Sequence, residues 1–253
     1  MLPPLHIPTI ILALVQTETM DEYIDLTIVY IFAASGLTVF VPFTLALLGL
    51  NKLDQGMKYF AALLCLVLVS ETTAFLVGAY FKVNNLLIYD IFTALEYVFL
   101  IAVFSCWFER GWFRTAMFAS VPVFLSVWIS AKLFVEVSGE FDSIFLSIES
   151  VVFVMISVVT LTKEMRDSTV LLADNPHFWI ASGTLVYFAG NLFVFALIEQ
   201  LLQPSVTRYH SAWLIHSGLN VTKNILFSLG FLSTGAPAER LRQWRSRNAA
   251  QEG

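Results

Sequence analysis

Residues 59–81, YFAALLCLVLVSETTAFLVGAYF, determine the class of this protein. Glu71 is the single charged residue in this stretch, which as an α-helix is long enough to cross the roughly 30 Å hydrocarbon core of a bilayer. Other parts of the chain have the same character, and together they give seven expected spans: Leu26–Leu50, Tyr59–Phe81, Leu86–Trp107, Trp112–Val135, Ser143–Thr162, Phe178–Leu202 and Ser211–Ser233. The sequence therefore predicts an all-α polytopic membrane protein with seven transmembrane helices.

The composition supports this class and limits the domain organisation. Of 253 residues, 58% are hydrophobic and 13% are charged, whereas soluble domains carry about 25% charged residues. The connectors between the spans are short, so we expect one transmembrane bundle over residues 26–233. An extracytoplasmic segment, residues 1–25, precedes it, and a basic cytoplasmic tail, residues 234–253, follows it. Dense basic sequence occurs only in this short tail, which argues against nucleic-acid binding.

Lysine and arginine residues indicate the orientation, because they are retained on the cytoplasmic side of a membrane. With the N-terminus outside, ten of the 14 fall on the cytoplasmic side: Lys52, Lys58, Arg110, Arg114, Lys163, Arg166, Arg240, Arg242, Arg245 and Arg247. Three fall outside, Lys82, Lys132 and Arg208, and the exterior is otherwise acidic. The sequence predicts an N-out, C-in topology.

The first 20 residues allow two interpretations. Ile10 to Val15 form an apolar patch that is too short to span a bilayer and lacks the basic flank of a signal peptide. Either this patch lies at the outer surface, or translation starts at Met20; both alternatives stay open.

The seventh span contains an unusually polar run, His216-Ser217-Gly218-Leu219-Asn220-Val221-Thr222-Lys223-Asn224. At about 100° per residue, His216, Asn220, Lys223 and Asn224 fall within roughly a 100° arc. One face of this helix is therefore polar from near its outer end to its centre.

Other spans carry polar groups at a similar depth. Ionisable side chains cost about 2.5–3.5 kcal/mol each in a membrane, so they usually face one another or a wet cavity. The candidate ligand-binding residues are Glu71, Asp90, Glu96, Glu149, Asn191, His216, Asn220 and Lys223. Gly183 and Gly190 precede Asn191 in the sixth span and favour close approach of a neighbouring helix.

Two structural interpretations compete with a binding site. Lys223 could form an ion pair with Glu96 or Glu71, and His216 could be a hydrogen-bonded core histidine. A lysine, a histidine and four acids nevertheless exceed what helix packing needs, so we expect a pocket that opens to the exterior.

A binding protein is the favoured function: a sensor, receptor or transporter component that holds a small polar or amphipathic ligand. Expected partners are membrane lipids and a membrane protein contacted through the basic segment Glu239–Arg247. A structural subunit of a larger membrane complex is the alternative. In that case, exposed helix faces should carry small residues for partner helices.

Enzymatic activity is less favoured, and no catalytic residue, metal ligand or cofactor is predicted. The seven-helix family that includes alkaline ceramidases holds zinc with a His-x-x-x-His pair in its last helix, whereas Asn220 follows His216 here. An intramembrane hydrolase stays an alternative. Lys223 in the last span and Asp90 in the third resemble microbial rhodopsins, but Leu219 stands where those proteins usually have an aspartate.

Three stretches resemble a group of small seven-helix bacterial inner-membrane proteins: Asn175-Pro176-His177-Phe178-Trp179-Ile180, Phe188-Ala189-Gly190-Asn191-Leu192-Phe193, and Ile215-His216-Ser217-Gly218-Leu219-Asn220 with Asn224-Ile225-Leu226. The resemblance implies a multi-pass protein of the cell inner membrane. It adds weight to Asn191, His216 and Asn220 as site residues and implies no activity.

Overall fold

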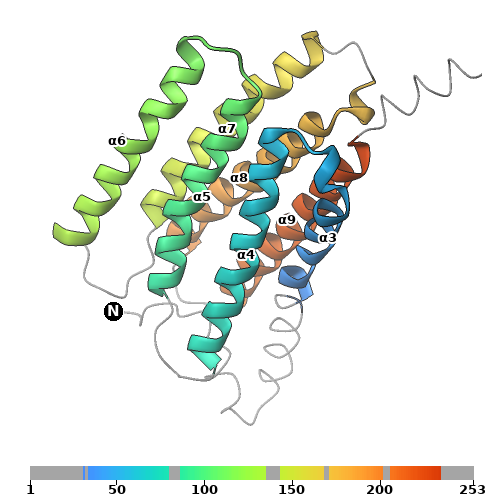
Figure 1. The fold of residues 1–253 in the computed structure, drawn as a ribbon. Coiled ribbons are helices and arrows are strands. Elements are labelled where there is room, and N and C mark those ends of the chain that lie inside the picture. Colours follow the sequence, from blue (N-terminus) through green and yellow to red (C-terminus); the bar gives the residue numbers. More distant parts are fainter. Residues whose placement is uncertain are drawn as a thin grey trace, which may run out of the picture.

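The described residues of the computed structural model, residue 31 and residues 34–79, 86–134, 143–167, 171–201 and 206–234, are helical apart from short connectors (Figure 1). The helices are α3 (Phe40–Gly49), α4 (Gln55–Ala79), α5 (Leu86–Cys106), α6 (Trp112–Phe134), α7 (Ser143–Asp167), α8 (Pro176–Leu201) and α9 (Val206–Ser233). Two 3₁₀ turns, Leu50–Lys52 and Leu172–Asp174, lie in the connectors. The predictions for residues 1–25 and for most of the tail lie outside the described residues.

Five stretches of the described chain are helical, long and apolar enough to cross a membrane: Ala34–Lys52, Gln55–Val77, Leu87–Cys106, Trp112–Lys132 and Leu146–Asp167. They correspond to the first five expected spans. The chain is therefore a multi-pass membrane protein, and the all-α prediction is confirmed for its described part. Helices α8 and α9 occupy the positions of the sixth and seventh expected spans.

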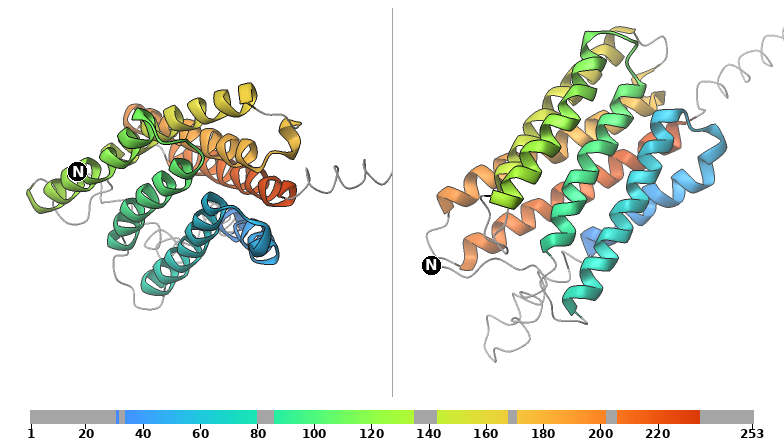
Figure 2. Two further views of the ribbon diagram at one scale, coloured as in Figure 1. Left: turned by 45° about the horizontal axis from the view of Figure 1, so that its top comes forward. Right: turned by 60° about the vertical axis from the view of Figure 1, so that its left-hand side comes forward.

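The helices run side by side in one bundle (Figures 1 and 2). Six of them pack in a closed order, α3 against α4, α4 against α5, α5 against α7, α7 against α8, α8 against α9, and α9 back against α3. Helix α6 packs mainly against α5 and lies at the edge of the bundle. Large apolar side chains of this helix, among them Phe118, Val123 and Val127, are exposed in a way that suits lipid contact.

Aromatic rings fill the interior and join helices that are distant in sequence. Phe153 of α7 is fully buried and contacts Tyr97 of α5 and Phe188 of α8, with ring centroids 5.3 and 5.1 Å apart. Phe60 of α4 meets Phe227 of α9 edge to face at 4.7 Å. Such ring pairs favour particular geometries, so they help to set how the helices pack.

Glycines allow α8 and α9 to approach closely, as the sequence predicted. A Cβ atom on Gly183 would lie 2.6 Å from the Phe227 ring, and one on Gly190 would lie 2.4 Å from the Leu219 side chain. Both helices carry candidate site residues, so this close packing also determines which of those residues can meet.

Candidate functional site

The polar face of α9 is shared between two neighbouring helical segments. His216 Nδ1 lies 2.8 Å from Asn191 Oδ1 of α8, so a protonated Nδ1 donates a hydrogen bond to this oxygen. The Asn220 side chain donates to the Ser35 carbonyl at 3.2 Å, and Asn224 donates to Thr38 Oγ at 2.8 Å. One edge of the polar face therefore contacts α8, and the other edge contacts the segment before α3.

Lys223 lies on the same edge of α9 as His216. Its ammonium lies 3.5 Å from the centroid of the Tyr187 ring of α8, which is a cation–π contact. Glu96 of α5 and Glu71 of α4 both act electrostatically on Lys223. Lys223 thus lies within electrostatic range of Glu96 and Glu71, the acids that the sequence suggested as its partners.

Glu149 of α7 is the least satisfied polar group of the cluster. Its side chain is 1% exposed, and neither carboxylate oxygen has a hydrogen-bond partner among the described residues. Tyr97 of α5 lies within electrostatic range of Glu149, but its hydroxyl donates instead to Ser120 Oγ at 2.9 Å. Glu96 of α5 lies within electrostatic range of Glu149.

Two predicted site residues have different surroundings. Asp90 forms an ion pair with Lys132 of α6 at 3.0 Å, so it faces the helix at the edge of the bundle. The Glu71 side chain is exposed on α4 although it lies within electrostatic reach of Lys223. Glu96, Glu149, Asn191, His216 and Lys223 form one cluster around Tyr187, whose ring contacts Lys223 and His216 and which lies within electrostatic range of Glu96 and Glu149.

The Asn191–His216 hydrogen bond should contribute a small, measurable coupling. We expect Asn191→Ala and His216→Ala to show a coupling energy of about 0.6 kcal/mol in a double-mutant cycle, the average for hydrogen bonds between transmembrane helices. The measurement is the free energy of unfolding in mixed micelles. Strictly additive effects of the two substitutions would contradict the contact.

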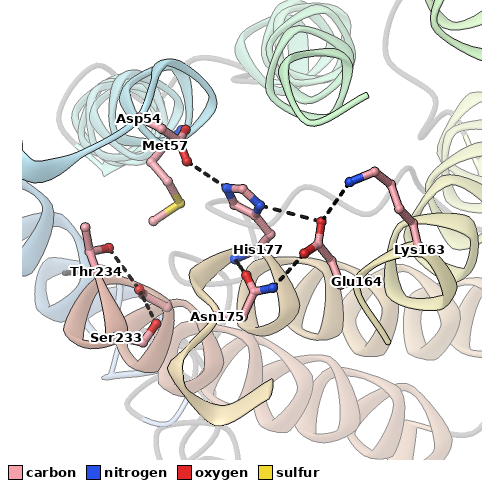
Figure 3. Close-up of polar contacts among 9 residues, drawn as sticks. Asp54, Met57, Lys163, Glu164, Asn175, His177, Ser233 and Thr234 are labelled. Carbon is pink, nitrogen blue, oxygen red and sulfur yellow. Dashed lines mark hydrogen bonds and ion pairs between the residues drawn. The ribbon is translucent and has the colours of Figure 1, made fainter. Parts of the chain in front are cut away.

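A second polar group, which the sequence analysis did not identify, lies at one end of the bundle (Figure 3). We call this group, which includes Asp54, Glu164, Asn175 and His177, the His177 network. Asp54 is the N-cap of α4, where its Oδ1 accepts a hydrogen bond from the Met57 N–H at 2.8 Å. The other oxygen of Asp54, Oδ2, lies 2.7 Å from His177 Nε2 in the first turn of α8.

Glu164, in the last turn of α7, completes this network. His177 Nδ1 lies 3.6 Å from Glu164 Oε1, and the Asn175 amide donates to Glu164 Oε2 at 2.6 Å (Figure 3). Lys163 donates to Glu164 Oε1 at 3.4 Å. Asn175 also caps α8, because its Oδ1 accepts from the His177 N–H at 2.9 Å. The network links the N-termini of α4 and α8 to the C-terminus of α7.

The two acids favour the charged form of His177. Burial lowers the pKa of His177, but the hydrogen bonds and charges of Asp54 and Glu164 outweigh burial and raise the pKa above its ordinary 6.5. Burial raises the pKa of Asp54, and the hydrogen bonds from His177 and Met57 outweigh it, so that the pKa of Asp54 lies below its ordinary 3.8.

An open cavity of about 550 Å³ lies beside this network. Its lining includes Trp107, whose ring stacks on His177 with centroids 4.4 Å apart. A Cβ atom on Gly56 would lie 2.4 Å from Trp107 Nε1, so this glycine makes room for the indole. The arrangement holds the His177 imidazole between two acids and against one aromatic face, and it joins three helix ends through side-chain contacts.

Helix-capping signals could have revealed this second group. Asn175-Pro176 places a preferred N-cap residue before a proline at the first helical position. Asp54 is also a preferred N-cap residue and directly precedes α4. His177 lies one residue before the expected sixth span, and no partner was predicted for it. Its partners lie 123 and 13 positions away in the chain, so spacing alone does not associate them.

Among the described residues, no three His, Cys, Asp or Glu side chains are placed so that they could hold a metal ion together. The chain matches no protein-family model, no curated protein and no solved structure. The resemblance to small bacterial inner-membrane proteins therefore stays a prediction.

Proposed function

We propose that this chain is a seven-helix protein of the cell inner membrane, oriented N-out and C-in, that binds a small polar or amphipathic ligand. The site lies between α5, α7, α8 and α9, with Glu71 of α4 at its margin. The protein acts as a sensor, receptor or transporter component.

The main support for this proposal is the buried carboxyl group of Glu149. A buried carboxyl group without a hydrogen-bond partner costs roughly 1–3 kcal/mol or more, and native proteins keep few of them. Other buried polar side chains of the bundle have partners: Asn191 pairs with His216, the Asn224 amide nitrogen with Thr38, and Tyr97 with Ser120. A ligand that supplies the missing partner would explain why Glu149 is buried with neither carboxyl oxygen hydrogen-bonded among the described residues.

The position of the cluster in the bundle also supports a ligand site. Glu149 lies about 9 Å along α7 from Ser143, at the end opposite to Glu164. The predicted topology assigns the Ser143 end to the exterior. A ligand could then enter from outside, while the His177 network holds the cytoplasmic helix ends together.

Native mass spectrometry of the gently extracted full-length chain tests this proposal. We expect the wild-type protein to carry a bound small molecule of constant mass, and Glu149→Gln to lose it. Asp167→Asn is the matched control, because it removes the charge of an exposed carboxylate on the same helix. His216→Ala should weaken the same adduct.

Unfolding temperatures distinguish loss of the ligand site from loss of the fold. Glu149→Gln should unfold at the same temperature as the ligand-free wild type or at a higher one, since it replaces a buried carboxyl group that has no partner with a neutral side chain of the same size. A wild type without any adduct, together with a destabilised Glu149→Gln protein, would contradict ligand binding and indicate a structural carboxyl group.

A further inference from the structure

Two cations from different helices meet at the connector between α5 and α6. Arg114, in the first turn of α6, donates a hydrogen bond to the Phe108 carbonyl, with Nη1 3.5 Å from the oxygen. Lys163, near the end of α7, places its ammonium 5.8 Å from the centroid of the Phe108 ring. Phe108 therefore holds a guanidinium and an ammonium near each other, at the end of the bundle where α7 ends and α6 begins (Figure 1).

The start of α6 adds to the positive potential at this place. A helix carries partial positive charge at its N-terminus, where acidic side chains are stabilising and basic ones are not. Helix α6 has no acidic residue in its first turn and has Arg114 there instead. An anion bound beside this turn would offset both the helix dipole and the guanidinium. Phosphate is well suited, because its oxygens can accept hydrogen bonds from the guanidinium in pairs.

Neighbouring acids leave the two cations accessible to such an anion. Among the described residues, Arg114 contacts the connector carbonyl and the Phe118 ring, with its guanidinium carbon 5.8 Å from the ring centroid, and no carboxylate. Lys163 lies 3.4 Å from Glu164, but that carboxylate is shared with His177. The Lys163 side chain keeps 31% of its surface exposed. Both cations can therefore turn toward a ligand at the surface.

Exposed apolar side chains continue from the two cations along the bundle. Trp112, two residues before Arg114, is 80% exposed, and indole rings gather at the boundary between membrane and water. Phe118, one turn further into α6, and Val159, one turn before Lys163 on α7, are exposed as well. A ligand at this surface meets cations at one end and apolar side chains at the other. These surroundings match a phospholipid, which joins a phosphate to acyl chains, better than a free anion.

We propose that an anionic phospholipid binds at this surface, with its phosphate between Arg114 and Lys163 and its acyl chains against the exposed side chains of α6. The predicted topology assigns this end to the cytoplasmic leaflet, where anionic lipids attract basic residues next to membrane spans. This inference goes beyond the proposed function and does not rest on it. Lys163 lies about 21 Å along α7 from Glu149, so the two sites are separate.

Native mass spectrometry of the full chain in micelles with equal amounts of dioleoylphosphatidylglycerol and dioleoylphosphatidylcholine tests this site. The two lipids share their acyl chains, so a difference in retention reports the headgroup. We expect the wild type to retain the anionic lipid roughly tenfold more than the zwitterionic one. The double variant Arg114→Gln/Lys163→Gln should lose this preference. Lys52→Gln/Lys58→Gln is the matched control, because it removes two exposed cations near the start of α4.

Three results would overturn the proposal. Equal retention of both lipids by the wild type would exclude a headgroup site, and equal losses in the two double variants would indicate diffuse surface charge. Displacement of the anionic lipid by excess inorganic phosphate would assign the two cations to a free ion. Lys163→Gln alone leaves the hydrogen bond of Arg114 in place and should lower the preference in part. An unchanged preference in this milder variant would also overturn the site, even if the double variant unfolds.

Discussion

Substituting Gly183 by alanine is expected to lower the free energy of unfolding by about 2 kcal/mol, because the added methyl group has no room. Its Cβ would lie 2.6 and 2.8 Å from two carbon atoms of the Phe227 ring and 3.2 Å from Leu226 Cβ. Phe227 cannot move away easily, since its ring also packs against the Phe60 ring, with centroids 4.7 Å apart. Helices α8 and α9 would have to separate.

Gly218→Ala is the control for this prediction. Gly218 lies in α9 with no atom within 4 Å of a Cβ, so alanine there should stabilise the protein by up to about 1 kcal/mol through helix propensity. The measurement is unfolding in mixed micelles. Equal effects of Gly183→Ala and Gly218→Ala would show that α8 and α9 are not packed this closely.

Separation of α8 from α9 should also disturb the candidate site. Asn191 and Tyr187 are on α8, and their partners His216 and Lys223 are on α9. We therefore expect Gly183→Ala to weaken the bound adduct as well as the fold, whereas Gly218→Ala should leave the adduct unchanged.

Replacing His177 by alanine should lower the free energy of unfolding by about 2 kcal/mol at pH 6. The substitution leaves Asp54 and buried Glu164 without their shared cation and removes the ring that stacks on Trp107. Loss of one partner of a buried ion pair costs about 3–5 kcal/mol, and we reduce this figure because Asp54 is partly exposed.

The cost of His177→Ala should depend on pH. The pKa of His177 is raised in the folded protein, so its protonated form stabilises the fold fully below pH 6.5 and loses this effect as the pH rises through the raised pKa. The pKa of Asp54 is lowered, so its contribution is present above pH 3.8 and is lost as the pH falls through the lowered pKa. The free energy of unfolding of the wild type should therefore decline as the pH rises above 6.5 and as it falls below 3.8.

Melting temperatures of wild type and His177→Ala, measured from pH 5 to pH 9, check this prediction. The difference between the two proteins should be largest near pH 6 and should shrink at the alkaline end. Asp167→Asn, which removes a charge at the same end of the bundle, should show no such trend. A difference that stays constant with pH would mean that His177 acts by packing alone.

Much of the fold could be predicted from the length of the apolar stretches in the sequence. The expected span from Leu86 to Trp107 agrees with α5, and Trp112–Val135 agrees with α6, because a long apolar stretch in a membrane must satisfy its backbone hydrogen bonds as a helix. Helices α7 and α9 extend about a turn and a half beyond their expected ends, since polar residues such as Glu164 continue the helix past the apolar segment.

The sequence by itself determined the helical multi-pass class, the apolar spans and the polar face of α9, because these follow from composition and helical periodicity. Only the tertiary structure decided that Asn220 and Asn224 contact the segment before α3 while His216 and Lys223 contact α8, and that Asp90 pairs with Lys132. It also decided that Glu149 lacks a partner and that His177 joins three helix ends. Periodicity gives the direction of a side chain on its own helix, whereas the partner depends on which helix packs against that face and at what depth.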